Sequence, residues 1–360
     1  MKKNLPGDRR AFLEKLGYLG AATFLAQSAG AAGAAENEVT VDFPSPENLA
    51  ARGEVPRRKF GKTDAVVSAM GLGGHTFAMA KSEAESIRIV QEAVDGGITF
   101  MDNAWEYHEG RSEEWMGKAL AEGGRRDKVF LMTKCCSHGR DKKVAMQQLD
   151  ESLRRLRTDH LDLWQIHECV YYNDPERHFA AGGAIEALTE AKKQGKVRFV
   201  GFTGHKDPAI HLEMLSHGYP FDACQLPLSG FDAQFRSFQN RVLPELNKQG
   251  IAAIGMKSLN GTAEAVKKGI IRAADTIRYA MSLPVAVTVS GIDSLDLLRE
   301  NLRLAREFTP MSRDERLAYE KQCAAFAGDG RFELYKTTAK FEGPAGREQH
   351  GFPAKEEMPG

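Results

Sequence analysis

Apolar residues recur along the chain with two alternating patterns from about Val55 onward. Short runs rich in Val, Ile, Leu and Phe are typical of buried strands, and they alternate with longer segments of helical period. In the segment 144–156, for example, Leu149, Leu153 and Leu156 fall on one face of a predicted helix. This part of the chain is therefore predicted to be a regular succession of strands and helices.

The pattern predicts eight strands and eight helices in alternation. The predicted strands are Val66–Met70, Thr99–Asn103, Val129–Lys134, Leu161–His167, Val197–Thr203, Phe221–Leu226, Ile251–Lys257 and Val285–Ser290. The predicted helices are Ser82–Asp95, Ser112–Glu122, Asp141–Arg157, Gly183–Gln194, Pro208–Ser216, Phe238–Lys248, Thr262–Met281 and Leu295–Phe308. Eight such units in about 250 residues predict an α/β fold, a (β/α)8 TIM barrel. A doubly wound sheet is the alternative, but its Gly-x-Gly-x-x-Gly turn is matched only in part by Met70–His75.

Two segments lie outside this repeat. Arg57–Ser68 predicts a β-hairpin with its turn at Gly61–Asp64, placed to plug the bottom of the barrel. The C-terminal tail is polar, but Phe332, Tyr335 and Phe341 predict that it packs on the barrel. We therefore divide the chain into a signal segment (1–35), a lead-in (36–54), the barrel (55–310) and a C-terminal extension (311–360).

The first residues have the composition of a cleavable signal peptide. A basic start that includes Arg9 and Arg10 is followed by the weakly apolar run Leu16–Ala26. A region of small residues comes next, and cleavage is predicted near residues 31–35. The run is too short and too weakly apolar for a stable membrane anchor. An amphipathic helix of the mature protein is the alternative, but it leaves the Ala/Gly run unexplained.

The sequence Arg9-Arg10-Ala-Phe-Leu-Glu-Lys resembles the twin-arginine (Tat) signal, whose consensus is Arg-Arg-x-Phe-Leu-Lys. The resemblance implies that the Tat export machinery recognises Arg9 and Arg10. The implied location of the mature protein is the periplasm.

Composition and charge exclude several classes of protein. Lys plus Arg and Asp plus Glu each number 49, so no net charge attracts nucleic acid. The five cysteines are an odd number and show no Cys-x-x-Cys spacing, which argues against a disulfide framework and against a zinc site. An ordinary globular enzyme or binding protein remains.

Four polar residues follow the ends of three consecutive predicted strands: Asp102, Tyr107, Lys134 and His167. Because active sites of such barrels lie at the C-terminal ends of the strands, these side chains are expected to meet at one rim. A neighbouring ammonium stabilises a phenolate, so Lys134 is expected to lower the pKa of Tyr107. Asp102 would hold Lys134, and His167 would hydrogen-bond a substrate oxygen. This set suits protonation of a carbonyl oxygen as hydride reaches the carbon.

The motifs TFMDNAWEYHEG, FLMTKC and LDLWQIH, followed by GKVRFVGFTGH, FDACQLPL and SLDLLRENL, closely resemble the aldo-keto reductases. The resemblance covers about Val55 to Phe308. It implies an oxidoreductase acting on a small carbonyl or alcohol, with Tyr107 as general acid/base, tuned by Lys134 and Asp102, and His167 orienting the carbonyl. It also implies NADPH or NADH bound across the barrel mouth without a Rossmann domain.

The same resemblance implies a set of cofactor contacts: Gly73, Thr203, Gln225, Met256, Lys257, Ser290, Glu300 and Asn301. Three positions depart from the family. Thr203-Gly204 replaces a Ser-Asn pair, and Met256 replaces an aromatic residue that commonly stacks on nicotinamide. The basic residues that grip a 2′-phosphate are missing near Asp296, so the choice between NADPH and NADH stays open.

Other interpretations also stay open. Histidines follow the first five strands (His75, His108, His138, His167 and His205), as in metal-dependent hydrolases, although the ligand spacing of such enzymes is absent. A barrel that binds nucleotide but turns over little is a second alternative. Cys135, Cys136 and Cys169 near the predicted site are either buried apolar residues or an oxidation-sensitive group. The predicted substrate wall comprises His75, Trp105 and Tyr171.

Overall fold

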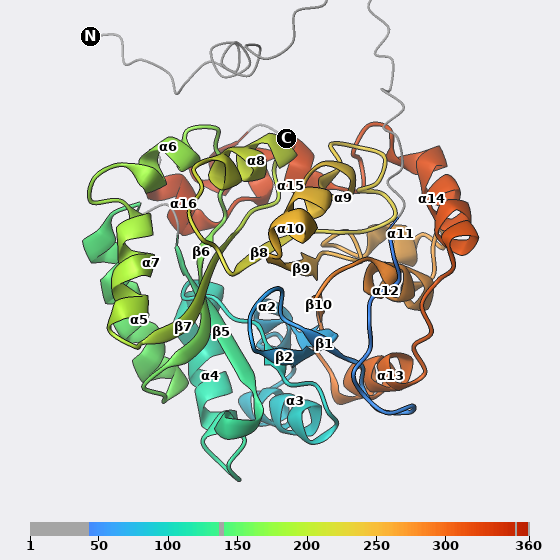
Figure 1. Ribbon diagram of the computed structural model, residues 1–360, viewed down its shortest axis with the longest axis horizontal. Coiled ribbons are helices and arrows are strands. Elements are labelled where there is room, and N and C mark those ends of the chain that lie inside the picture. Colours follow the sequence, from blue (N-terminus) through green and yellow to red (C-terminus); the bar gives the residue numbers. More distant parts are fainter. Residues whose placement is uncertain (1–42, 137–139, 350, 359–360) are drawn as a thin grey trace, which may run out of the picture.

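The computed structural model describes residues 43–136, 140–349 and 351–358. Eight parallel strands close into a barrel in the order β10-β3-β4-β5-β6-β7-β8-β9, with helices outside (Figure 1). The strands are β3 (Met70–Leu72), β4 (Phe100–Met101), β5 (Phe130–Cys136), β6 (Leu161–His167), β7 (Val197–Thr203), β8 (Ala223–Pro227), β9 (Ala252–Met256) and β10 (Val287–Ser290). The predicted TIM barrel is confirmed. The predicted signal segment lies outside the described residues.

The main helices each bury one face against the barrel. They are α3 (Glu83–Asp95), α4 (Arg111–Leu120), α5 (Lys142–Leu156), α7 (Ala184–Lys193), α8 (Pro208–Ser216), α10 (Leu243–Gln249), α12 (Ala273–Ser282) and α13 (Leu295–Arg306). Short helices lie between them: α2 (Gly74–Phe77), η1 (Tyr107–Gly110), η2 (Arg126–Lys128), α6 (Asp174–Phe179), α9 (Phe238–Arg241) and α11 (Glu264–Lys267). Within the described ranges, no helix combines the length and apolar character needed to cross a membrane.

Three predicted elements differ from the observed ones. The run Val66–Met70 is not one strand: Val66–Ser68 is the second hairpin strand, and the barrel strand begins at Met70. The Ser68 hydroxyl donates to the Met70 carbonyl (2.7 Å) and accepts from the Thr99 amide (2.9 Å), which holds the junction between the two strands. The predicted helices 262–281 and 238–248 are each divided in two. Gly269 adopts a left-handed conformation (φ 69°) between α11 and α12, and Pro244 lies at the start of α10.

The hairpin of β1 (Arg57–Lys59) and β2 (Val66–Ser68) closes the N-terminal end of the barrel, as predicted. Phe60 between these strands is fully buried. Its ring centroid lies 4.7 Å from that of Phe130, the first residue of β5, and 6.3 Å from that of Phe100, the first residue of β4. The core at this end is therefore filled by aromatic side chains. The opposite end, formed by the C-terminal ends of the strands, is left for the polar residues.

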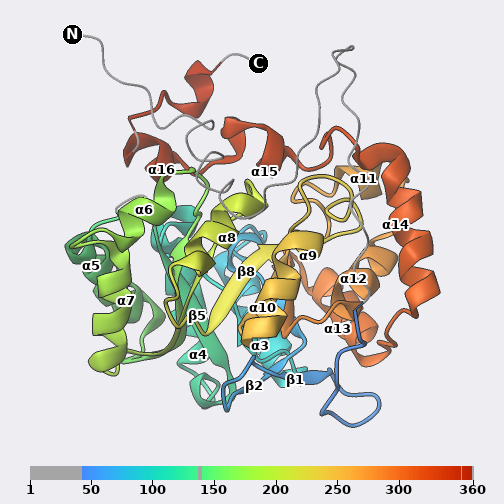
Figure 2. The same cartoon turned by 45° about the horizontal axis from the view of Figure 1, so that its top comes forward.

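The C-terminal extension packs on the barrel, as predicted. It lies over that opposite end, and Figure 2 shows it crossing the top of the barrel. It contains α14 (Arg313–Ala327), α15 (Leu334–Thr337), η4 (Ala339–Phe341), α16 (Pro344–Gln349) and η5 (Lys355–Glu357). Lys336 anchors it: the ammonium is fully buried and pairs with Asp232 at 2.6 Å and Glu333 at 2.8 Å. The extension is thus part of the folded body and reaches the rim of the barrel.

Candidate active site

The four polar residues predicted at the strand ends come together at the C-terminal rim. Asp102 follows β4, Tyr107 opens η1, Lys134 lies in β5 and His167 ends β6. The Lys134 ammonium lies 2.6 Å from the Asp102 carboxylate and 3.4 Å from the Tyr107 hydroxyl. The His167 ring meets the Tyr107 ring edge-on, with centroids 5.5 Å apart. The phenol therefore has an ammonium near its hydroxyl and an imidazole beside its ring.

The surroundings of Tyr107 raise its pKa well above the ordinary value of 10. Burial is the main cause, and the negative charges of Asp102, Glu106 and Glu168 add to it. This direction is opposite to the one predicted from Lys134 alone, because burial and the charges of Glu106 and Glu168 outweigh the neighbouring ammonium. A phenol in this environment keeps its proton at neutral pH and is suited to donate it.

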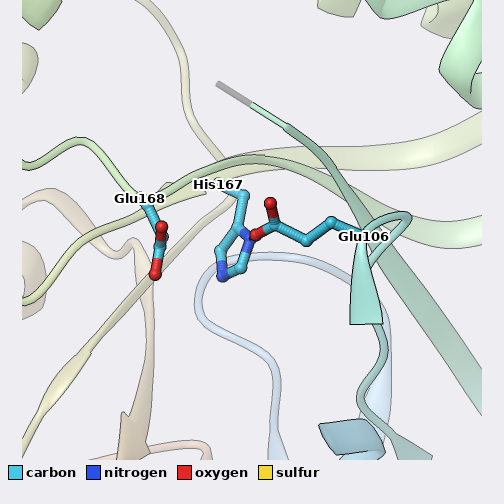
Figure 3. A group of neighbouring side chains, drawn as sticks. All are labelled: Glu106, His167 and Glu168. Atoms are coloured by element: carbon cyan, nitrogen blue, oxygen red, sulfur yellow. The ribbon is translucent and has the colours of Figure 1, made fainter. Parts of the chain in front are cut away.

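Two carboxylates that the sequence analysis missed flank His167 (Figure 3). Glu106 Oε1 lies 2.6 Å from His167 Nδ1, but the two atoms are not aligned for a hydrogen bond. Glu168 lies on the other side, with Oε1 3.3 Å from His205 Nε2. Each glutamate is adjacent in sequence to a predicted site residue, Tyr107 or His167. That adjacency was the available signal, but only the fold shows where the carboxylates point.

Glu106, His167 and Glu168 each offer a ligand atom, and these atoms lie within 4.8 Å of one another. One imidazole with two carboxylates is a donor set that divalent cations accept. Of the histidines predicted around the rim, His75 and His108 contact each other, with His108 Nε2 2.7 Å from the His75 carbonyl oxygen. His138 lies outside the described residues. The described histidines thus do not form one shared ligand cluster.

The three predicted substrate-wall residues have different surroundings. His75 is exposed, and its ring meets Tyr107 edge-on at 5.3 Å, so it lies at the mouth of the site. Trp105 instead faces α5: its indole donates to Glu151 (2.7 Å) and lies under the Arg155 guanidinium. Tyr171 donates its hydroxyl proton to Glu342 of the extension. Only His75 is therefore placed beside the phenol.

The predicted cofactor residues follow the rim from β7 to β10. Thr203 is buried at the end of β7, and the Gln225 amide on β8 donates to Asp102 (3.3 Å). Met256 and Lys257 at the end of β9 are half-buried. Burial lowers the pKa of Lys257 to about 8. Among the described residues, Lys257 forms no ion pair; its ammonium lies over the rings of Tyr335 (5.6 Å) and Phe341 (5.0 Å).

At the end of β10, the Ser290 hydroxyl donates to Asn301 (2.8 Å), whose amide donates to the Leu297 carbonyl (2.8 Å). The Gly73 amide donates to the Ser290 carbonyl (2.8 Å), and a Cβ on Gly73 would lie only 2.9 Å from that oxygen. Gly73, Ser290 and Asn301 are thus linked by hydrogen bonds in one polar corner at the end of β10. Glu300 is exposed on α13 and has no part in it.

The extension completes the rim with residues that the sequence analysis did not assign to the site. The Tyr335 carbonyl contacts His205 Nδ1 at 3.2 Å. The Gly343 amide donates to Glu168 at 3.4 Å, and a Cβ on Gly343 would lie 3.5 Å from Glu106 Oε2. The extension thus covers the carboxylates beside His167 as well as Lys257.

The cysteines near the site, Cys135, Cys136 and Cys169, are buried. Burial raises the pKa of Cys135 to about 12 and that of Cys169 well above its usual range. The Cys136 thiol donates to Glu106 at 3.4 Å. Because the thiolate is the reactive form, these surroundings favour the interpretation of Cys135 and Cys169 as inert core residues.

Comparison with known proteins identifies the family. The model of the "Aldo/keto reductase family" matches residues 69–275. The chain belongs to the aldo/keto reductase family. "Aldo-keto reductase YhdN" of Bacillus subtilis is 29% identical over 204 residues, which cover 53% of this chain and 58% of YhdN. "Uncharacterized oxidoreductase YqkF" of the same organism is 24% identical over 324 residues, 78% of this chain and 98% of YqkF.

Solved structures agree in fold. An aldo-keto reductase from Bacillus halodurans, in its holo form, superposes with a TM-score of 0.60 at 23% identity, covering 77% of this chain and 99% of its own. One from Klebsiella pneumoniae, in complex with NADP and acetate, gives 0.59 at 20% identity and covers 72% and 93%. The family resemblance inferred from the motifs is confirmed, and this membership supports an NAD(P)H-dependent oxidoreductase.

Proposed function

We propose that this enzyme transfers hydride between a nicotinamide cofactor and a carbonyl or alcohol group of a small substrate, with Tyr107 as the proton donor in reduction. The observation that carries the proposal is the position of the Lys134 ammonium, 2.6 Å from Asp102 and 3.4 Å from the Tyr107 hydroxyl. This arrangement holds a positive charge where a phenolate would form.

The proton transfer follows from the surroundings of the phenol. Burial and three carboxylates keep the Tyr107 proton in place in the resting enzyme. As a carbonyl oxygen gains negative charge, it becomes a stronger base than the phenolate and takes that proton. Lys134 then faces the phenolate, and Asp102 balances the ammonium. Alcohol oxidation is the reverse, with the phenolate accepting the proton.

The residues at the ends of β7 to β10 suit a nicotinamide dinucleotide, which supplies the hydride when bound. Among the described residues, the Lys257 ammonium lies in the field of Glu168 but forms no ion pair, and it lies over the rings of Tyr335 and Phe341, so it suits a pyrophosphate. A Cβ on Gly73 would lie 2.9 Å from the Ser290 carbonyl oxygen, so glycine lets the chain pass close to the end of β10 beside the polar corner. Thr203, Gln225 and Met256 are proposed to face the nicotinamide, and Glu300 the adenine. NADPH and NADH both remain candidates.

Tyr107→Phe tests the proposal, combined with fluorescence titration by NADPH and by NADH. The variant removes one hydroxyl, so cofactor affinity should stay within about twofold while turnover of a test aldehyde falls by at least ~100-fold. Unchanged turnover would exclude Tyr107 as the proton donor. A nucleotide-binding regulatory barrel, in contrast, binds cofactor but shows no turnover in either form.

We further propose that Arg9 and Arg10 direct the protein to the periplasm through the Tat machinery. A route for folded proteins suits a barrel whose rim is assembled from all of its strands and holds a cofactor made in the cytoplasm. The Arg9→Lys/Arg10→Lys variant should accumulate in the cytoplasm with its signal uncleaved. Unimpaired export of that variant would contradict the proposal, as would mature protein that is always purified without nucleotide.

A further inference from the structure

We infer that Gln165 is a positioning residue: its side-chain amide fixes the orientation of Gln225, and Gln225 in turn holds the carboxylate of Asp102. The effect on kcat rests on the proposed function, whereas the hydrogen bonds are a property of the folded protein. The Gln165 amide donates to Gln225 Oε1 (3.1 Å), and the Gln225 amide donates to Asp102 Oδ1 (3.3 Å). Gln165, Gln225 and Asp102 are 0%, 2% and 4% exposed.

The orientation of both amides follows from the charge on Asp102. Its Oδ1 lies 2.6 Å from the Lys134 ammonium, and an ionised carboxylate accepts hydrogen bonds but donates none. Gln225 must therefore turn its NH2 group toward Asp102, which points its carbonyl oxygen the other way. That oxygen needs a donor, and Gln165 Nε2 supplies it. Reversing either amide would bring two oxygen atoms together.

The strand between the two glutamines leaves room for their contact. Gln165 lies on β6 and Gln225 on β8, so the contact passes over β7. The residue of β7 in register with Gln165 is Gly201. A Cβ at this position would lie 3.3 Å from Gln165 Oε1 and 2.4 Å from the Ala223 carbonyl oxygen. Glycine therefore lets the Gln165 side chain reach across to β8.

The stability of the barrel alone does not explain a glutamine at position 165. Its Nε2 donates to Gln225 and to the Met132 sulfur (3.5 Å), but its buried Oε1 has no hydrogen-bond partner among the residues that the structure describes. An unpaired buried acceptor destabilises a fold, and an apolar side chain of similar volume avoids this penalty. What an apolar side chain cannot supply is the donor for Gln225. We therefore assign Gln165 to the orientation of the site.

A double-mutant cycle in the full-length enzyme tests the inference. Gln165→Met removes the donor but keeps the side-chain length, so kcat should fall roughly 2- to 10-fold, as for the loss of one hydrogen bond. The KM of the carbonyl substrate should stay within about twofold, because Gln165 is fully buried inside the barrel. Gln225→Met should lower kcat further, and in that background Gln165→Met should have no additional effect. An equal effect of Gln165→Met in both backgrounds would overturn the inference.

Gln239→Met provides the matched control. Gln239 is also a fully buried glutamine that donates to one side chain, Glu320 (3.1 Å), and accepts from another, Tyr279 (2.8 Å), but it lies on α9 in the helical layer. The same chemical change should therefore lower stability here while kcat stays within about twofold. A fall in kcat as large as that of Gln165→Met would overturn the inference, because any buried glutamine would then have this effect.

A second readout does not depend on turnover. In protein labelled with 15N at the glutamine side chains, the Gln225 amide protons should exchange slowly with solvent, and their signals are assigned by their loss in Gln225→Met. Gln165→Met should speed this exchange by at least ~3-fold, because Gln225 loses the contact that stops its amide from rotating. Gln239→Met should leave the exchange unchanged.

Unchanged exchange of the Gln225 amide in Gln165→Met would overturn the inference, whatever the kinetics. If the wild-type protein reduces no carbonyl at all, the proposed function fails. The exchange measurement still decides in that case whether Gln165 orients Gln225, so the two failures are distinguishable.

Discussion

Lys134 on β5 and Asp102, the residue after β4, form a buried ion pair with 2.6 Å between Nζ and Oδ1 and side-chain exposures of 1% and 6%. The Lys134 ammonium also donates to the Asn103 carbonyl (2.6 Å), so its position is fixed by two acceptors. The charge beside Tyr107 is therefore placed by the fold before any substrate arrives.

Asp102→Asn is expected to damage stability and activity together. Removing one partner of a buried ion pair leaves the other charge uncompensated, which costs about 3–5 kcal/mol of the free energy of unfolding. Turnover should fall at least ~100-fold, because Lys134 loses the partner that fixes it. Urea unfolding and kcat measure the two effects.

A surface ion pair with the same nitrogen–oxygen distance provides the control. Lys196 and Asp150 are also 2.6 Å apart, but their side chains are 30% and 60% exposed. Asp150→Asn should therefore cost no more than about 1 kcal/mol and leave kcat unchanged. Equal losses in the two variants would show that burial does not govern the strength of these pairs.

Cofactor affinity is expected to depend on pH through Lys257. The pKa of this ammonium is lowered to about 8 by burial, so the free enzyme carries the charge below pH 8 and loses it above. If Lys257 binds the pyrophosphate, the Kd for NADPH and for NADH should rise as the pH increases from 7 to 9.5. Fluorescence titration across this range measures the change.

Lys257→Met is the variant that isolates this effect. It should bind cofactor more weakly at pH 7 and should lose most of the dependence on pH. Its affinity should approach that of the wild type at high pH, where Lys257 is neutral. A wild-type Kd that stays constant between pH 7 and 9.5 would exclude Lys257 as a phosphate contact.

Lys336→Met is expected to loosen the C-terminal extension. The substitution leaves Asp232 and Glu333 buried without their shared cation, so we expect a loss of about 3–5 kcal/mol of unfolding free energy. Limited proteolysis should cut the extension sooner in this variant than in the wild type. Lys321→Met on the exposed side of α14 is the control and should change neither result.

The barrel and the four rim residues could be predicted because both depend on local spacing. Strand and helix periods are visible within a few residues, and a polar residue at a strand end reaches the same rim in any such barrel. For this reason Asp102, Tyr107, Lys134 and His167 came together as expected.

The missed features depend on long-range packing. Trp105 faces α5 because of Glu151 and Arg155, which lie more than forty positions away in sequence. The raised pKa of Tyr107 depends on burial and on where Glu106 and Glu168 point. No sequence pattern reports either property. The first barrel strand was misplaced by a few residues because Ser68 ends one β element just before Met70 begins the next.

The position of the extension also sets an order of events during synthesis. Tyr335, Phe341 and Gly343 follow the barrel by more than twenty-five residues in sequence, yet they contact Lys257, His205 and Glu168 on three different strand ends. While the ribosome still holds residues 335–343, the barrel can close but its rim lacks this cover. The rim is therefore completed later than the barrel, only when these residues have emerged and folded back over the strand ends.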